Sequence, residues 1–106
     1  MRSISTKEYF EKTQTPEILE GSILIDVRSP EEYAQSHIPG AVNKPLDQFS
    51  VWGEEMGHYT TVFVNCRSGG RSGAACSILS SHGVNTINIQ GGVLDWEQSG
   101  YTLEKS

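Results

Sequence analysis

Two short apolar runs constrain the fold of this chain most strongly. Residues 22–27 and 61–65 are almost continuously apolar over the length of one strand, and each run leads into a segment with helix-start signals. Such runs are typical of strands that are buried on both faces of a parallel sheet. Because parallel strands need helical crossovers, the sequence predicts an α/β fold with helices on both faces of a central parallel sheet.

Local signals mark further boundaries. Two capping boxes, Ser5 with Glu8 and Ser29 with Glu32, predict helices that end near residues 12 and 36. The remaining pattern predicts strands at 41–43 and 86–89, helices at 73–81 and 93–99, and a short helix followed by a loop within 46–58. In the helix at 73–81, one face is expected to carry Ala74, Ala75, Ile78 and Leu79.

Length and charge restrict the class of protein. The 106 residues are expected to form one domain, 1–106, with a core that needs no metal or disulfide. A net charge of -5 without any basic run argues against nucleic acid as a partner. No apolar stretch is long enough to span a membrane and no signal peptide is visible, so we expect a cytoplasmic protein.

The chain has two cysteines, Cys66 and Cys76, and the two are expected to differ in role. Ten residues separate them and no histidine lies nearby, which does not fit a zinc site, and no other metal site is predicted. Cys76 lies within the helix at 73–81, where a small apolar residue fills the core. Cys66 ends the second apolar run and precedes that helix, where a reactive thiol is expected.

The segment from Cys66 to Ser72 favours an ionised cysteine. Gly69 and Gly70 allow the backbone to curl so that its N–H groups point at one spot. The following helix adds the partial positive charge of its N-terminus, and Arg67 and Arg71 add two full charges. Each of these effects favours the nucleophilic thiolate over the thiol.

Three segments together resemble the single-domain rhodanese family of sulfurtransferases over nearly the whole chain. They are Leu24-Ile25-Asp26-Val27-Arg28 continued through Glu32-Tyr33 to His37-Ile38-Pro39-Gly40-Ala41, Asn43 and Pro45; the loop Cys66 to Ser72, which matches Cys-x-x-Gly-x-Arg-Ser; and Gly91-Gly92 followed by Trp96 and Gly100. The resemblance implies a rhodanese-like fold and a catalytic Cys66.

The resemblance also implies a two-step reaction without a metal or organic cofactor. Cys66 takes the outer sulfur of a small anionic donor such as thiosulfate and becomes a persulfide. A thiophilic acceptor, cyanide or a thiol, then removes this sulfur. The acceptor can equally be the thiol of another protein, and the sequence does not separate this relay from turnover of small molecules.

Several residues around Cys66 receive expected roles. Arg67 either holds an anionic donor or is simply solvated, while Arg71 anchors the loop to a carboxylate such as Glu32 or Asp26. Ser68 and Ser72 donate hydrogen bonds to the sulfur, or Ser72 caps the helix. The last group, which we interpret as a structural ion-pair brace, consists of Asp26, Arg28 and Glu32.

Other classes of protein also use a cysteine in an anion-binding loop. Cysteine phosphatases and arsenate reductases typically place an arginine six positions after the cysteine, whereas Arg71 follows Cys66 by five. The resulting ring is tighter and suits a sulfur atom better than a tetrahedral oxyanion. A non-catalytic binding module is disfavoured because inactive rhodanese-like domains generally lack the cysteine.

Overall fold

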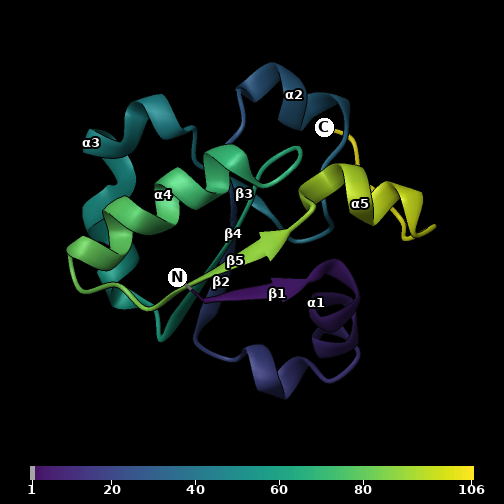
Figure 1. Cartoon of the computed structure of the whole chain (residues 1–106), viewed down its shortest axis with the longest axis horizontal. Helices are drawn as coiled ribbons and strands as arrows, with labels where there is room; N and C mark the ends of the chain where they lie inside the picture. The colour runs from purple at the N-terminus through teal and green to yellow at the C-terminus, as the bar shows by residue number, and fades with distance from the viewer. Residues whose placement is uncertain (1) are drawn as a thin grey trace.

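The computed structural model describes residues 2–106 and contains a five-stranded sheet in which every pairing between the strands is parallel. The strand order is β1-β5-β4-β2-β3 (Figure 1). The strands span β1 Ser3–Ser5, β2 Ser22–Asp26, β3 Val42–Asn43, β4 Thr61–Asn65 and β5 Thr86–Gln90. The predicted α/β class and parallel sheet are therefore confirmed.

The helices follow the strands in sequence and lie on both sides of the sheet in space. The α-helices span α1 Thr6–Thr13, α2 Pro30–Gln35, α3 Phe49–Trp52, α4 Gly70–Ser81 and α5 Gly92–Gln98, and the 3₁₀ helices span η1 Pro16–Leu19, η2 Leu46–Gln48 and η3 Gly53–His58. Both predicted capping boxes are present, with Ser5 and Ser29 as the N-caps of α1 and α2. No helix among residues 2–106 is long and apolar enough to cross a membrane.

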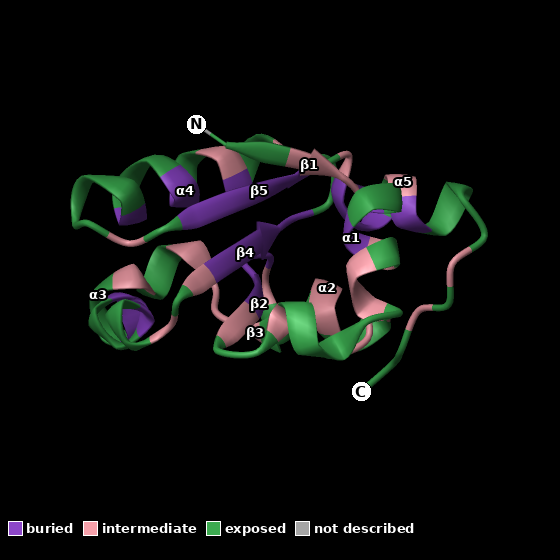
Figure 2. Ribbon diagram, turned by 90° about the horizontal axis from the view of Figure 1, so that it is seen from below, coloured by how far each residue is buried: buried purple, intermediate pink, exposed green. Residues whose placement is uncertain are grey.

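Two hydrophobic clusters cover the two faces of the sheet. Alternate residues of β4 point to opposite faces, so Val62 and Val64 join the cluster under α3, η3 and α4, while Phe63 joins the cluster under α1 and α5. Figure 2 shows β4 and β5 as largely buried ribbons between exposed helical surfaces. Burying one large aliphatic side chain contributes about 1.5–3 kcal/mol, so these central strands hold a large share of the folding free energy.

Three features of the fold differ from the sequence-based expectations. Residues 46–58 are helical throughout, as η2, α3 and η3, rather than a short helix and a loop. Strand β1 was not predicted, because it has three residues and two of them are serines. Helix α4 begins at Gly70, and its buried positions include Ser72, Cys76 and Leu79, whereas Ile78 is 37% exposed.

The predicted buried face of α4 was therefore partly wrong. Ala75 and Leu79 are fully buried, but Ala74 and Ile78 face outward. Ser72 and Cys76 replace them, since residues four apart lie on one side of a helix. With this face of α4 against the sheet, the Ser72 hydroxyl points toward β5 and toward Cys66.

Candidate active site

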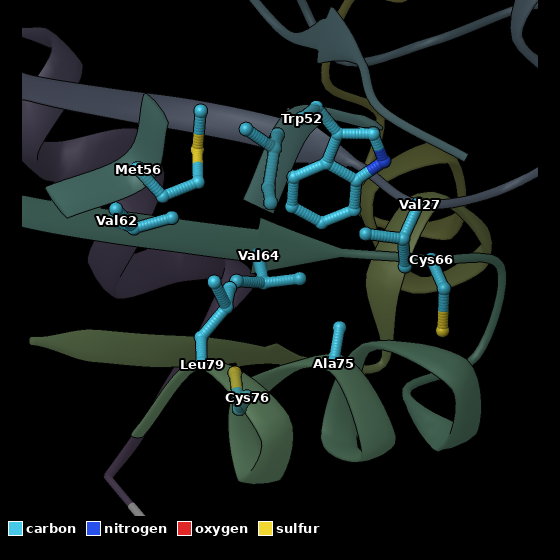
Figure 3. Close-up of a cluster of buried hydrophobic side chains, with 10 residues drawn as sticks. Val27, Trp52, Met56, Val62, Val64, Cys66, Ala75, Cys76 and Leu79 are labelled. Atoms are coloured by element: carbon cyan, nitrogen blue, oxygen red, sulfur yellow. The ribbon is translucent and has the colours of Figure 1, made fainter. Parts of the chain in front are cut away.

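Cys66 lies at the carboxyl edge of the sheet, where ligands bind in open α/β folds. It directly follows β4, and the register of β2 with β4 pairs Asp26 with Asn65. Val27 and Cys66 are consequently neighbours at the same edge, as Figure 3 shows. The side chain of Cys66 is 1% exposed, so its sulfur lies beneath the loop rather than on the outer surface.

The loop is closed by one left-handed glycine. Gly69 has φ 113° and forms the N-cap of α4, a conformation that side chains with a Cβ rarely adopt. Gly70 is the first residue of α4 and keeps a negative φ, so only one of the two glycines expected to need positive φ has it. Arg67 and Ser68 are exposed on the loop.

Hydrogen-bond donors converge on the sulfur. The Gly69 N–H donates to Cys66 Sγ over 2.9 Å, and Ser72 Oγ lies 3.4 Å from the same sulfur. Burial by itself raises the pKa of Cys66, but the Ser72 hydroxyl and the backbone N–H groups of Ser72, Gly69 and Ser68 outweigh it. The pKa of the Cys66 thiol is therefore below its ordinary value.

Ser72 also contacts β5. Its hydroxyl donates to Asn88 Oδ1 over 2.5 Å and lies 3.1 Å from the Gly69 carbonyl oxygen. Ser72 is 0% exposed and Asn88 is 7% exposed, so both side chains make these contacts away from water. Nothing in the local sequence singles out Asn88, because the contact joins two residues that are 16 positions apart in the chain.

The first turn of α5 holds the other side of the loop that follows Cys66. The N–H groups of Val93 and Leu94 donate to the carbonyl oxygens of Cys66 and Arg67 over 2.9 and 3.0 Å. Gly92 has φ 55°, and a Cβ at this position would lie 2.2 Å from the Cys66 carbonyl oxygen. With these two carbonyls held by α5, the loop N–H groups are free to face the sulfur.

In the sequence, Gly91 and Gly92 belong to the pattern that resembles the rhodanese family, and a double glycine is also typical of a turn. Gly91 has φ 80° and is the N-cap of α5, which fits a turn. The close approach of Gly92 to the loop was missed, because no local pattern indicates which backbone a glycine will meet. The double glycine itself was the available signal.

Arg71 is bound to Glu32. Its Nη1 and Nη2 donate to the two carboxylate oxygens over 2.7 and 2.9 Å, so Glu32 and not Asp26 is its partner. This bond is the largest of the effects that lower the pKa of Glu32 to about 2. The two side chains are 44% and 30% exposed, which limits the contribution of the pair to stability.

Asp26 and Arg28 form a second, buried pair. Arg28 donates to both carboxylate oxygens of Asp26, with 2.8 Å for the shortest contact, and its Nη2 also donates to the Ser36 carbonyl. The three residues expected to form one brace thus belong to two pairs. Asp26–Arg28 links β2 to the end of α2, while Glu32 links α2 to the loop that follows Cys66.

The charge around the loop differs from the expected excess of two positive charges. Arg71 is neutralised by Glu32, and Arg67 lines a small hollow of about 190 Å³ together with Glu32 and Glu97. The sulfur is therefore stabilised mainly by nearby N–H groups and the Ser72 hydroxyl, and less by a net positive field.

A groove of about 640 Å³ borders the loop on the side of Arg71. Its walls come from residues 27–31 and 45–48, and its lining includes Val27, Pro30, Pro45 and Leu46. The groove therefore combines these apolar side chains with polar ones, and Arg71 lies at its border with the loop. The groove and the smaller hollow at Arg67 therefore border the loop at two different residues, Arg71 and Arg67.

Cys76 and Trp52 are both part of the buried hydrophobic core. Cys76 is 0% exposed inside the cluster drawn in Figure 3, and burial raises the pKa of its thiol to about 11. Trp52 is buried and its Nε1–H donates to the Pro45 carbonyl. Within residues 2–106, no group of three or more His, Cys, Asp or Glu side chains is arranged to hold a metal ion.

Comparisons with known proteins agree with this geometry. The family described as "Rhodanese-like domain" matches residues 5–99. A putative sulfurtransferase of Bacillus subtilis is 36% identical over 97 residues, which cover 92% of this chain and 91% of that protein. The thiosulfate sulfurtransferase PspE of Escherichia coli is 40% identical over 73 residues, covering 67% and 70%.

A solved structure extends the agreement to the whole chain. The rhodanese-related protein of Thermoplasma volcanium superposes with a TM-score of 0.87 at 26% identity and covers 100% of both chains. The chain belongs to the family of rhodanese-like domains. Its sulfurtransferase-named relatives support a role in sulfur transfer or sulfur carriage.

Proposed function

We propose that this protein is a sulfurtransferase that carries a sulfane sulfur as a persulfide on Cys66. The observation that supports this most directly is the polar surrounding of Cys66 Sγ, where the Gly69 N–H donates over 2.9 Å and the Ser72 hydroxyl oxygen lies 3.4 Å away. Polar groups placed in this way stabilise an anionic sulfur, which both the thiolate and the persulfide of the proposed cycle carry.

In the first step the Cys66 thiolate attacks the outer sulfur of thiosulfate. A bond forms between Cys66 Sγ and this sulfur, while the bond to the sulfonyl sulfur breaks and sulfite leaves with the electron pair. The lowered pKa of Cys66 raises the fraction of nucleophilic thiolate at neutral pH. Arg67 is the candidate for holding the donor, because it is exposed at the rim of the loop.

In the second step an acceptor attacks the outer sulfur of the Cys66 persulfide. Cyanide becomes thiocyanate, or a thiolate becomes a persulfide, and the electrons of the broken S–S bond return to Cys66 as thiolate. The thiol of another protein can act in the same way. In the reducing cytoplasm that we propose as its location, the two free thiols remain available.

Intact-mass spectrometry after incubation with thiosulfate tests the proposal. We expect a gain of one sulfur atom that cyanide removes with release of thiocyanate. The Cys66→Ser variant should gain nothing, while Cys76→Ala, the matched control at the other cysteine, should load as the wild type does. Loading that survives in Cys66→Ser would exclude Cys66 as the carrier.

The same protein preparation separates the alternative classes. Rapid hydrolysis of an aryl phosphate without any gain of sulfur would indicate a cysteine phosphatase instead. The bidentate contact of Arg71 with Glu32 argues against that result, because this arginine is not free to clamp an oxyanion over the cysteine.

A further inference from the structure

The interface of α4 with β5 contains polar side chains that the proposed reaction does not yet use. Ile87 and Ile89 of β5 point toward α1 and α5, so Thr86 and Asn88 point toward α4. There Thr86 meets Ser80 over 2.8 Å and Asn88 meets Ser72 over 2.5 Å. These two contacts resemble each other, but only the second continues to Cys66.

The hydroxyl of Ser72 has one hydrogen and more than one acceptor within reach. When Cys66 is a thiol, its S–H donates to Ser72 Oγ, and the Ser72 O–H donates to Asn88 Oδ1. Asn88 Oδ1 is the closest acceptor at 2.5 Å, compared with 3.1 Å for the Gly69 carbonyl oxygen. In this state the hydroxyl hydrogen points away from the sulfur.

When Cys66 ionises, its sulfur changes from a hydrogen-bond donor to an acceptor. A thiolate has no hydrogen to donate, and it lowers its free energy only if the Ser72 O–H turns toward it. The hydrogen must then leave Asn88 Oδ1, and a buried carbonyl oxygen without a donor is costly. A side-chain amide can avoid this cost, because a half-turn places its NH₂ group where its oxygen was.

We propose that Asn88 is a positioning residue that turns its amide with the charge of Cys66. With the thiol, Asn88 Oδ1 accepts from the Ser72 hydroxyl. With the thiolate or persulfide anion, Asn88 Nδ2 donates to Ser72 Oγ, and the Ser72 O–H donates to the anionic sulfur. No proton passes between Asn88, Ser72 and Cys66; the thiol proton leaves to solvent and the other hydrogens only change direction.

A double-mutant cycle tests whether Asn88 acts through Ser72. Asn88→Asp keeps the shape and the acceptor but removes the donor, and Ser72→Ala removes the hydroxyl. The readout is the pH midpoint for alkylation of Cys66 by iodoacetamide, resolved from Cys76 by peptide mass mapping. Thr86→Val is the matched control, since it removes the parallel contact with Ser80 on the same interface.

With Ser72 present, Asn88→Asp should raise the midpoint of Cys66 by about 1 pH unit or more, because a charge-assisted hydrogen bond is lost. In the Ser72→Ala background the same substitution should raise it by clearly less, since only the direct effect of the new carboxylate remains. Thr86→Val should leave the midpoint unchanged. Equal shifts by Asn88→Asp in both backgrounds, or no shift in either, would overturn the proposal.

A second measurement needs no substitution in the network. The side-chain NH₂ resonances of Asn88 in a ¹⁵N-labelled protein should move with pH at the alkylation midpoint of Cys66, and this movement should vanish in Cys66→Ser. Resonances that do not respond to Cys66 would contradict the turning amide. The inference takes Cys66 as the sulfur carrier from the proposed function, but alkylation and NMR need no sulfur transfer, so failure to load sulfur leaves this test intact.

Discussion

Cys66 and Cys76 offer a comparison between two ends of one buried cluster. Both are almost fully buried, with 1% and 0% exposure, and both pack against the α4 face of the sheet (Figure 3). Yet the pKa of Cys66 lies below its ordinary value, and that of Cys76 is raised to about 11. Burial is therefore not what distinguishes a reactive thiol from a structural one in this protein.

The difference lies in the donors that each sulfur meets. Cys66 sits before the first turn of α4, whose N–H groups have no partners within the helix. Cys76 sits in the middle of α4, where the backbone N–H groups are used by the helix itself, and the Thr86 hydroxyl is too weak to offset burial. The same helix therefore supplies N–H donors to Cys66, which precedes its first turn, but none to Cys76, which lies near its middle.

The largest expected effect is a difference in reactivity between the two thiols at neutral pH. Because the pKa of Cys76 is about 11 and that of Cys66 is lowered, alkylation of Cys66 should be more than about a hundredfold faster. Peptide mapping after a timed exposure to iodoacetamide measures both rates in one sample. Similar rates for the two cysteines would break the comparison on which the proposed chemistry depends.

The next largest effect concerns the support that α5 gives to the loop. Gly92→Ala would place a Cβ 2.2 Å from the Cys66 carbonyl oxygen, so the loop must shift and its N–H groups must leave the sulfur. Since small misplacements of reacting groups can cost about a hundredfold in rate, we expect persulfide formation from thiosulfate to fall by roughly that factor. Stopped-flow or timed mass measurements can follow the loading.

Gly100→Ala serves as its control. Gly100 also has a positive φ, but a Cβ there meets no atom within 4 Å, so the variant carries backbone strain without a contact to the loop. If both variants lose loading equally, the loss reflects general destabilisation and the role of α5 in holding the loop is refuted.

The features that sequence predicted well are those that depend on neighbouring residues. The capping boxes of α1 and α2 are contained in four consecutive residues each, and both form. Cys66 followed by glycines and a helix start is likewise a local pattern. Strand β4 was recognisable because both of its faces are buried, which leaves a continuous apolar run.

The features that sequence missed depend on contacts between distant segments. Asn88 reads as an ordinary polar residue of a strand until α4 places Ser72 above it. Gly92 reads as a turn residue until the loop is seen to pack on it. The 3₁₀ helices of residues 46–58 have no 3.6-residue period to recognise, and β1 is too short to show alternation.

A smaller effect is expected at Arg67. Of the two arginines in the loop, only Arg71 forms an ion pair within 4.0 Å among residues 2–106. Arg67→Ala should raise the apparent KM for thiosulfate several-fold and leave kcat nearly unchanged, because an exposed charge contributes to binding rather than to the chemical step. Arg67→Lys keeps the charge and should restore most of the loss. An unchanged KM in Arg67→Ala would leave this arginine as a solvated side chain.

The smallest effect concerns the tie between the loop and α2. Glu32→Gln removes the partner of Arg71, and because both side chains are partly exposed we expect the free energy of unfolding to fall by only about 0.5–1 kcal/mol. The folded pKa of Glu32, about 2, lies below its unfolded value of about 4.5, although solvent screening of this partly exposed pair keeps its contribution well below the ~3 kcal/mol that such a shift would otherwise imply. The stabilisation by this pair is therefore complete above pH ~4.5 and is lost as the pH falls toward ~2.

Chemical denaturation across this acid range measures the effect. The wild type should lose stability between the two pKa values more steeply than Glu32→Gln, so the two curves converge at low pH. Glu31→Gln is the matched control, because the neighbouring Glu31 makes no ion pair among residues 2–106. If Glu31→Gln changed the acid limb as much as Glu32→Gln does, the effect would belong to general charge and not to the bond that anchors the loop of Cys66.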